Sequence, residues 1–120
     1  MKKENKELKN HNFIDAWKNA FNGIIYATTT QGNIQKQLII AVIVVIVSLF
    51  FNLNRAEFLC FLFTIVLIIF AEMVNTAIET VVDLYVDVYH PKAKIAKDVA
   101  AGGVVITTIN AIIVAYFLFF

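Results

Sequence analysis

The sequence has few cysteines, prolines, glycines and charged residues. In 120 residues it contains one cysteine, one proline and four glycines, and only 16% of the residues are charged. The single cysteine, Cys60, excludes an intramolecular disulfide, and it lies in an apolar run where no neighbour in the sequence would activate its thiol. The net charge of +1 gives no indication of a nucleic-acid partner.

The sequence also lacks several recognisable segments. It has no internal repeat, proline-rich linker or low-complexity run, and no glycine-rich loop of the kind that binds nucleotide phosphates. Residues 1–10 are polar and lack the apolar core and cleavage site of a signal peptide. We therefore expect a flexible N-terminus that stays in the cytoplasm.

Apolar residues are abundant instead. They make up 60% of the chain, which is more than a soluble fold of this size can bury. Three long apolar runs predict membrane helices over residues 34–53, 58–86 and 94–120, since about 20 apolar residues cross a bilayer core. The turn-forming residues 52–55 and the His90-Pro91 pair separate these runs.

A further helix is predicted over residues 11–31, before the first membrane helix. Apolar residues such as Phe13 and Trp17 recur at helical spacing, while polar residues such as Asn19 occupy other faces. This pattern is typical of an amphipathic helix in the membrane interface. We therefore expect an all-α integral membrane protein, in which residues 1–120 form a single domain of one surface helix and three transmembrane helices.

The distribution of basic residues predicts the orientation in the membrane. Nine of the ten Lys and Arg residues lie before Ile39 or between Lys92 and Lys97. Because positively charged loops stay in the cytoplasm, we expect the N-terminus and the loop before the third membrane helix on that side, with the C-terminus outside. The cytoplasmic end of the second membrane helix then lies where ATP is available.

That end of the second membrane helix carries the most informative residues of the chain. At about 100° per residue, one stripe of the predicted helix holds Glu72, Asn75, Glu79 and Asp83. A carboxylate in a membrane helix is costly and by default indicates a functional site. We interpret Asp83 as a solvated charge beyond the apolar region, but Glu72 and Glu79 need a functional explanation.

Phosphoryl transfer from ATP is the chemistry that these residues favour. It needs a divalent metal bound by oxygen atoms, a cation near the phosphates and a group that orients or deprotonates the acceptor. Glu72 and Glu79 lie two helical turns apart, so one can hold a metal while the other meets a lipid alcohol. Glu72 is closer to the apolar run and is the better candidate for the general base, and Asn75 can position the same hydroxyl.

A second group of polar residues lies around the start of the third membrane helix. Lys97 is a candidate phosphate clamp, and Asp98 can order that lysine or bind a nucleotide hydroxyl. Tyr89 and His90, in the preceding loop, are candidate nucleotide contacts, with a simple turn as the alternative for His90. Asn19 of the surface helix is a further candidate contact of the nucleotide.

These groups of residues lie in segments that resemble a known family. Residues 72–84, EMVNTAIETVVDL, are similar to the signature of the prokaryotic diacylglycerol kinase family, and residues 90–102, HPKAKIAKDVAAG, are similar to its second block. The second block looks closer to the undecaprenol kinases of Gram-positive bacteria than to the diacylglycerol kinases of Gram-negative bacteria. The similarity is strong over residues 70–105.

The resemblance implies a homotrimer in the bacterial cytoplasmic membrane, with active sites shared between subunits. It implies transfer of the γ-phosphate of ATP to a membrane lipid alcohol, with Mg²⁺ as the metal. By the same resemblance, Glu72 matches the catalytic base and Asn75 its neighbour. Glu79 matches a metal ligand, and Lys97 with Asp98 matches the nucleotide contacts.

Two positions depart from the family pattern. Where members usually have a glutamate in Thr-Glu-Arg-Asn as a second metal ligand, this chain has Gln31 in Thr-Gln-Gly-Asn. We predict that Gln31 is a metal ligand through its amide oxygen, which brings no charge. Asn12 replaces an arginine that members often carry, and this change removes a phosphate contact.

The sequence thus predicts an ATP-dependent lipid kinase that acts on undecaprenol and gives undecaprenyl phosphate. Diacylglycerol kinase is the close alternative, because substrate choice depends on the shape of a lipid groove. A degenerate, non-catalytic membrane relative is another alternative, and Gln31 and Asn12 are the residues that support it. A small ion channel is a further alternative, although Lys97 and Asp98 fit a phosphate site better than a pore.

Overall fold

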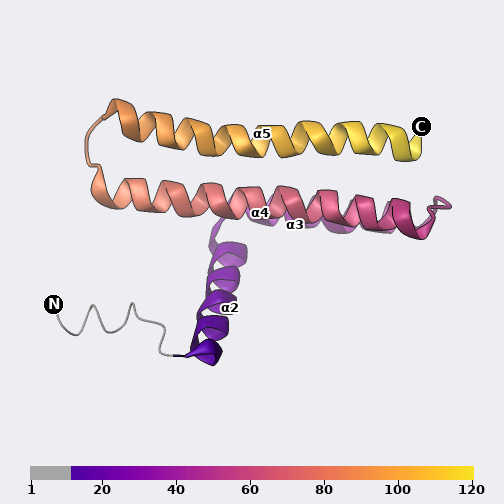
Figure 1. The fold of residues 1–120 in the computed structure, drawn as a ribbon, viewed down its shortest axis with the longest axis horizontal. Helices are drawn as coiled ribbons and strands as arrows, with labels where there is room; N and C mark the ends of the chain where they lie inside the picture. The colour runs from indigo at the N-terminus through magenta and orange to yellow at the C-terminus, as the bar shows by residue number, and fades with distance from the viewer. Residues whose placement is uncertain (1–11) are drawn as a thin grey trace. The chain divides into compact units, whose positions relative to one another are not determined.

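The fold is built from helices. The structure is a computed structural model that describes residues 12–120, and the predicted flexible segment 1–10 lies outside the described residues. The described residues contain no strand, and their helices are α2 (Phe13–Thr30), α3 (Gly32–Ser48), α4 (Arg55–Tyr85) and α5 (Pro91–Phe119) (Figure 1). The predicted all-α class is confirmed. The helices fall into two compact units, one with α2 up to Gln31 and the other with residues 32–120.

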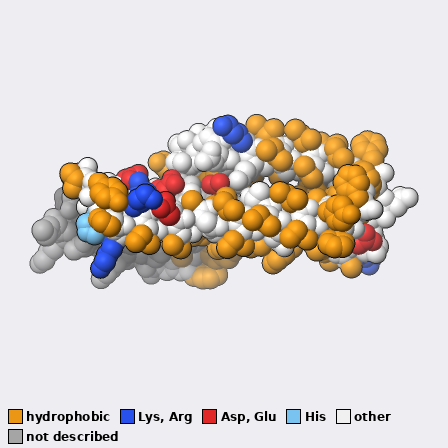
Figure 2. All heavy atoms as spheres, turned by 90° about the horizontal axis from the view of Figure 1, so that it is seen from above, with side chains coloured by type: hydrophobic (Ala, Val, Ile, Leu, Met, Phe, Trp, Pro, Cys, Tyr) orange, Lys and Arg blue, Asp and Glu red, His pale blue; other side chains and the backbone are white. Residues whose placement is uncertain are grey.

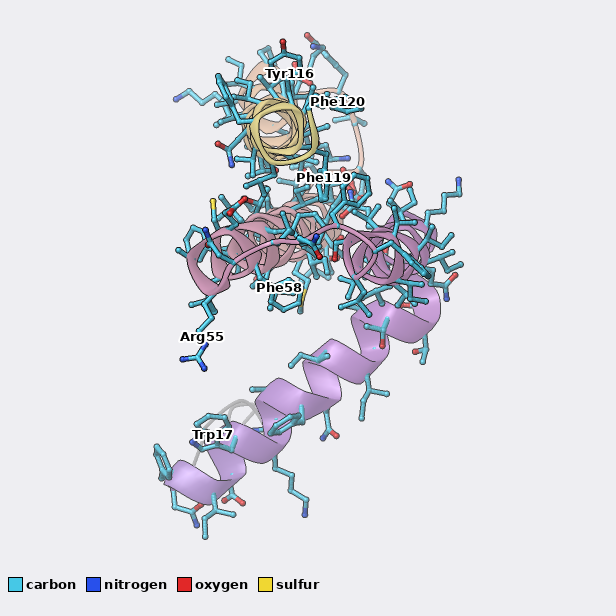
Figure 3. All side chains as sticks on the ribbon, turned by 90° about the vertical axis from the view of Figure 1, so that its right-hand side faces the viewer. Trp17, Arg55, Phe58, Tyr116, Phe119 and Phe120 are labelled. Atoms are coloured by element: carbon cyan, nitrogen blue, oxygen red, sulfur yellow. The ribbon has the colours of Figure 1, made fainter. Side chains whose placement is uncertain are left out.

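In the unit of residues 32–120, α4 and α5 form a long antiparallel hairpin (Figure 1). α5 packs along α4, while α3 contacts the flank of α4 less extensively (Figure 3). α4 and α5 are each long and apolar enough to cross a membrane, and a third span is reached only when α2 and α3 are counted together. The hairpin is therefore the scaffold that carries most of the predicted site residues.

A capping box explains why α4 begins at Arg55 and not at the predicted residue 58. The Asn54 side chain accepts a hydrogen bond from the Glu57 backbone N–H (2.9 Å), and the Glu57 side chain accepts one from the Asn54 backbone N–H (3.5 Å). These reciprocal bonds satisfy two backbone donors that have no partner inside the helix. The apolar pattern alone does not show this first turn.

α5 likewise begins earlier than predicted, at Pro91 and not at residue 94. The His90 side chain accepts a hydrogen bond from the Lys92 backbone N–H (3.2 Å), and Pro91 takes the first helical position. Proline suits that position because its missing N–H would have no partner there and its fixed φ matches the helix. The helix then runs to Phe119.

α3 is shorter than the predicted membrane helix 34–53. It begins at Gly32 and ends at Ser48, and the Phe51 backbone N–H donates to the Ser48 carbonyl in the turn that follows. Its 17 residues rise about 1.5 Å each and so extend about 25 Å. The prediction of a helix up to residue 53 is therefore wrong, because hydrophobicity continues through residues 49–51 after the helical hydrogen bonds have ended.

Very little of the chain is buried. Among the described residues, the buried hydrophobic side chains are Ala27, Ile34 and Phe61, and α5 buries no residue completely. Large apolar side chains are exposed on every described helix, and hydrophobic side chains cover much of the face in Figure 2. An apolar surface of this extent needs lipid or another protein to cover it, as expected for a membrane protein.

Aromatic side chains hold together the end of the hairpin where α5 finishes. The Phe119 ring centre lies 4.8 Å from that of Phe51 and 5.6 Å from that of Phe61, both in edge-to-face geometry. Phe119 points from α5 toward α4 (Figure 3). Such aromatic pairs contribute about 0.5–1.5 kcal/mol beyond their area burial, so this cluster fixes the end remote from the α4–α5 loop.

α2 has the amphipathic pattern that the sequence predicts. The Asn12 side chain accepts a hydrogen bond from the Asp15 backbone N–H (2.8 Å) and so caps the helix. Phe13, Trp17 and Phe21 follow one another along α2 with successive ring centres 5.9 and 6.1 Å apart, and all three are exposed. An exposed aromatic row of this kind suits the membrane interface.

Candidate active site

Glu72 and Asn75 are buried in α4, although most of that helix is not. Their exposed fractions are 7% and 8%, which places them among the few fully buried residues of the described chain. They lie one helical turn apart and therefore on the same face of α4. The fold thus shields the carboxylate that the sequence proposes as the catalytic base, and its catalytic role stays a prediction.

A residue of α3 holds the Glu72 carboxylate. The Gln37 side-chain N–H donates to Glu72 Oε1 over 3.2 Å, and this bond joins α3 to α4. Gln37 is not among the site residues predicted from the sequence. A signal was present, because a polar side chain inside the apolar segment 34–53 is unusual enough to call for a partner.

Asn75, which is buried on the same face of α4 as Glu72, is hydrogen-bonded to Glu79. Its side-chain N–H donates to Glu79 Oε1 over 3.2 Å, while its Oδ1 atom is buried and has no hydrogen-bond partner. Glu79 itself is exposed, whereas Glu72 is buried. The two carboxylates thus have different surroundings, which agrees with separate tasks for them.

The lysine predicted to clamp phosphate is already paired. Lys97 Nζ donates to Asp83 Oδ1 over 2.5 Å, linking the start of α5 to the end of α4. Lys94 Nζ donates to Asp98 Oδ2 over 2.6 Å along α5. All four side chains are exposed, and exposed ion pairs are weak, so the phosphates of a nucleotide can compete for these lysines.

Charged side chains gather toward one end of the face in Figure 2. His90 is the N-cap of α5, and its Nδ1 accepts the Lys92 N–H, so the turn role left open in the sequence analysis is present. Tyr89, just before it, is 77% exposed. A contact of Tyr89 or His90 with a nucleotide stays a prediction.

Two predicted site residues belong to the other unit. Asn19 lies on α2 and is exposed, and Gln31 is the C-cap of α2, where its backbone N–H donates to the Ala27 carbonyl (3.1 Å). The roles of Asn19 in nucleotide binding and of Gln31 in metal binding stay predictions from the sequence.

The donor set suits a magnesium site that the substrate completes. The described residues include no group of three or more His, Cys, Asp or Glu side chains that could hold a metal ion. Mg²⁺ is usually bound by one or two carboxylates together with substrate phosphates. The exposed carboxylate of Glu79 is an oxygen donor of this kind.

An apolar groove of about 360 Å³ lies between α3, α4 and α5. Its wall is mostly aliphatic, with residues such as Ile40, Val44, Ile65, Ile68, Ile69 and Ile112. The hydroxyls of Thr64 and Thr108 donate to carbonyls of their own helices. Gln37 is the earliest α3 residue of the lining, so it marks one end of the groove and places Glu72 beside that end.

Known proteins match the chain over these helices. A family model described as prokaryotic diacylglycerol kinase matches residues 18–119. The chain belongs to the prokaryotic diacylglycerol kinase family. The members of this family are lipid kinases, so the predicted family, the predicted class of enzyme and the membrane character are confirmed, and use of ATP follows from the class.

Two curated relatives of this kinase family differ in the substrate that their names state. The chain is 38% identical to a diacylglycerol kinase of Synechocystis sp. over 104 residues. This match covers 86% of the chain and 59% of that relative. It is 34% identical over 107 residues to the undecaprenol kinase of Bacillus subtilis, which covers 89% of the chain and 87% of that relative. The chain therefore spans less than two thirds of the first relative.

Proposed function

We propose that this chain is a lipid kinase that transfers the γ-phosphate of ATP to undecaprenol and forms undecaprenyl phosphate. The observation that carries this proposal is a buried carboxylate, Glu72, beside the end of an apolar groove. The groove can take the part of a lipid alcohol chain next to its hydroxyl, and the carboxylate can then meet that hydroxyl.

In the proposed reaction Glu72 is the general base. The lipid hydroxyl oxygen attacks the γ-phosphorus of ATP and forms the new O–P bond, while its proton passes to the Glu72 carboxylate. The bond between the γ-phosphorus and the bridging oxygen breaks, and ADP leaves with that electron pair. The buried amide of Asn75, one turn from Glu72, positions the reacting hydroxyl.

The nucleotide is proposed to bind near the α4–α5 loop. Lys97 exchanges its partner Asp83 for a phosphate oxygen, while Asp98, which is paired with Lys94 and not with Lys97, is left as a candidate contact of a nucleotide hydroxyl. Glu79 would hold Mg²⁺ together with the phosphates, and Gln31 stays a further predicted ligand from the sequence. Bound Mg²⁺ supplies positive charge that offsets the charge of the phosphates.

The polarity of the groove favours undecaprenol over diacylglycerol. A polyprenol has a single polar atom, its hydroxyl, whereas a diacylglycerol also carries two ester groups whose carbonyl oxygens accept hydrogen bonds. The threonine hydroxyls of the groove already donate to helix carbonyls, and the Gln37 N–H donates to Glu72. The second N–H of the Gln37 amide is then the one side-chain donor left among the groove-lining residues, so two ester carbonyls inside this groove could not both be hydrogen-bonded, which is unfavourable.

The proposal also includes the predicted homotrimer and orientation. The large apolar surface and the absence of fully buried residues in α5 are compatible with contacts between copies of the chain. We propose that these copies share active sites. Following the distribution of basic residues, we also propose that the site faces the cytoplasm.

The experiment is a direct comparison of acceptors. The full chain is reconstituted into lipid vesicles, and transfer of the γ-phosphate of ATP is followed with undecaprenol or diacylglycerol at equal mole fractions. A higher kcat/KM for undecaprenol is expected. A preference for diacylglycerol would overturn the narrower substrate, and no transfer to either lipid would favour the non-catalytic alternative.

A further inference from the structure

Gln37 belongs to both functional features of this unit, the apolar groove and the surroundings of the proposed base Glu72. It lines the end of the apolar groove, and its N–H donates to Glu72 Oε1 over 3.2 Å. Glu72 lies on α4, whereas Gln37 lies on α3, so this bond links the proposed base to a groove-lining residue of a second helix. Gln37 is thus placed to fix the base relative to the lipid.

The hydrogen bond leaves Glu72 with one free oxygen. A carboxylate has two oxygens, and Gln37 occupies only Oε1. A side chain of Glu has three rotatable bonds, so without this bond the carboxylate could turn away from the groove. A base must lie within hydrogen-bond reach of the hydroxyl, and small errors in its position lower the rate strongly.

The other half of the Gln37 amide argues against a purely structural role. Its Oε1 atom is buried and has no hydrogen-bond partner, and the Oδ1 atom of Asn75 is buried and unpaired in the same way. A buried carbonyl without a donor is costly, so a link that served only helix packing would be better made by a fully paired or an apolar side chain. Gln37 is hydrogen-bonded to Glu72 and Asn75 lies one helical turn from it, so both unfilled acceptors belong to residues next to the proposed base and indicate a place where a ligand donor arrives.

We propose that Gln37 is a positioning residue that holds the Glu72 carboxylate at the mouth of the lipid groove. The inference rests on the proposed function, because it assigns to Gln37 the orientation of the proposed base. It predicts that the amide acts through Glu72, on the transfer step and not on nucleotide binding.

The test uses Gln37→Met in the full chain in vesicles. Methionine has a similar volume and keeps the groove apolar, but it removes the donor to Glu72. We expect kcat to fall about 10- to 100-fold while the KM for ATP stays unchanged, since misplacing a catalytic group has effects of this size. Gln37→His, which restores an N–H donor, should recover much of the lost rate.

The matched control is Gln35→Met, an exposed glutamine of the same helix. It makes the same chemical change two residues away and should keep the wild-type kcat. A second readout combines Gln37→Met with Glu72→Gln. If Gln37 acts through Glu72, the double variant has the same residual rate as Glu72→Gln alone.

Each outcome decides the matter. A wild-type kcat in Gln37→Met, a rise in the KM for ATP, or a further loss in the double variant would overturn this inference while leaving the proposed function intact. A wild-type chain that transfers no phosphate would overturn both. If Gln37→Met does not fold, Gln37→His decides: near wild-type kcat supports the donor role, and an inactive but folded protein contradicts it.

Discussion

α4 and α5 are similar in length and hydrophobicity, but they differ in how many residues they bury. They contain 31 and 29 residues, and each is apolar enough to cross a membrane. α4 completely buries four residues, the apolar Phe61 and the polar Thr64, Glu72 and Asn75. α5 completely buries none.

The difference shows that burial in this hairpin does not follow hydrophobicity. In a soluble protein the apolar side chains would be inside, but here lipid or other copies can cover them. The interior between α3 and α4 is then available for polar side chains such as Gln37 and Glu72, which need protection from lipid. In the proposed mechanism α4 carries the catalytic residues and the first turns of α5 bind the nucleotide, while the rest of α5 exposes its apolar surface.

The largest effect is expected for the buried base of α4. Glu72→Gln keeps the shape of the side chain but removes the proton acceptor, so kcat should fall about 10²- to 10⁴-fold. The measurement is the rate of phosphoryl transfer at saturating ATP and lipid.

The control for this variant is Glu57→Gln, at the other end of α4. Glutamine can also complete a capping box, so the helix start is kept and the wild-type rate is expected. Equal losses in the two variants would mean that α4 is sensitive to lost charge in general, and the assigned role of Glu72 would be wrong.

The part of the site that can be predicted from the sequence consists of residues that lie along a single helix. Glu72, Asn75 and Glu79 share a face because of helical periodicity, and a carboxylate in an apolar run is visible from the sequence alone. The family, the helical class and the approximate position of each helix follow from the same local patterns. These features need no knowledge of which helices touch.

The remaining part depends on contacts between residues far apart in the sequence. The Gln37 bond to Glu72 joins positions 35 residues apart, and the Asp83 bond to Lys97 joins positions 14 apart. Helix ends were also predicted poorly, because capping hydrogen bonds, such as the reciprocal pair between Asn54 and Glu57, are not visible in the hydrophobic pattern. Helical periodicity predicts which residues share a face of one helix, but it does not predict which residues of other helices they contact.

The next largest effect is expected at the start of α5. Lys97→Met removes the proposed phosphate clamp and should raise the KM for ATP about 10-fold or more, the usual worth of a hydrogen bond to a charged group. Lys94→Met is the matched control, since Lys94 also lies on α5 and is also paired with a carboxylate. Equal rises in KM in steady-state kinetics would show that the two lysines act only through general positive charge.

The surface of α5 can be tested through its small residues. A Cβ atom built at Gly102 or Gly103 would meet nothing within 4 Å inside the chain, so packing within one copy does not require glycine there. If other copies pack against α5 at these two glycines, Gly103→Leu should shift crosslinked protein from trimer to monomer. Val105→Leu, at an exposed position of the same helix, should leave the crosslinking pattern unchanged.

The smallest effect is expected where α4 and α5 meet in solvent. Asp83→Asn removes the partner of Lys97 and should lower the KM for ATP by no more than a few-fold, because an exposed ion pair competes only weakly with a phosphate. Asp87→Asn, which removes the same charge from the neighbouring loop, separates this effect from a change in the net charge near the site. If Asp83→Asn instead weakens ATP binding as Lys97→Met does, the ion pair orders the lysine for the nucleotide, and the two helices contribute to that site as one unit.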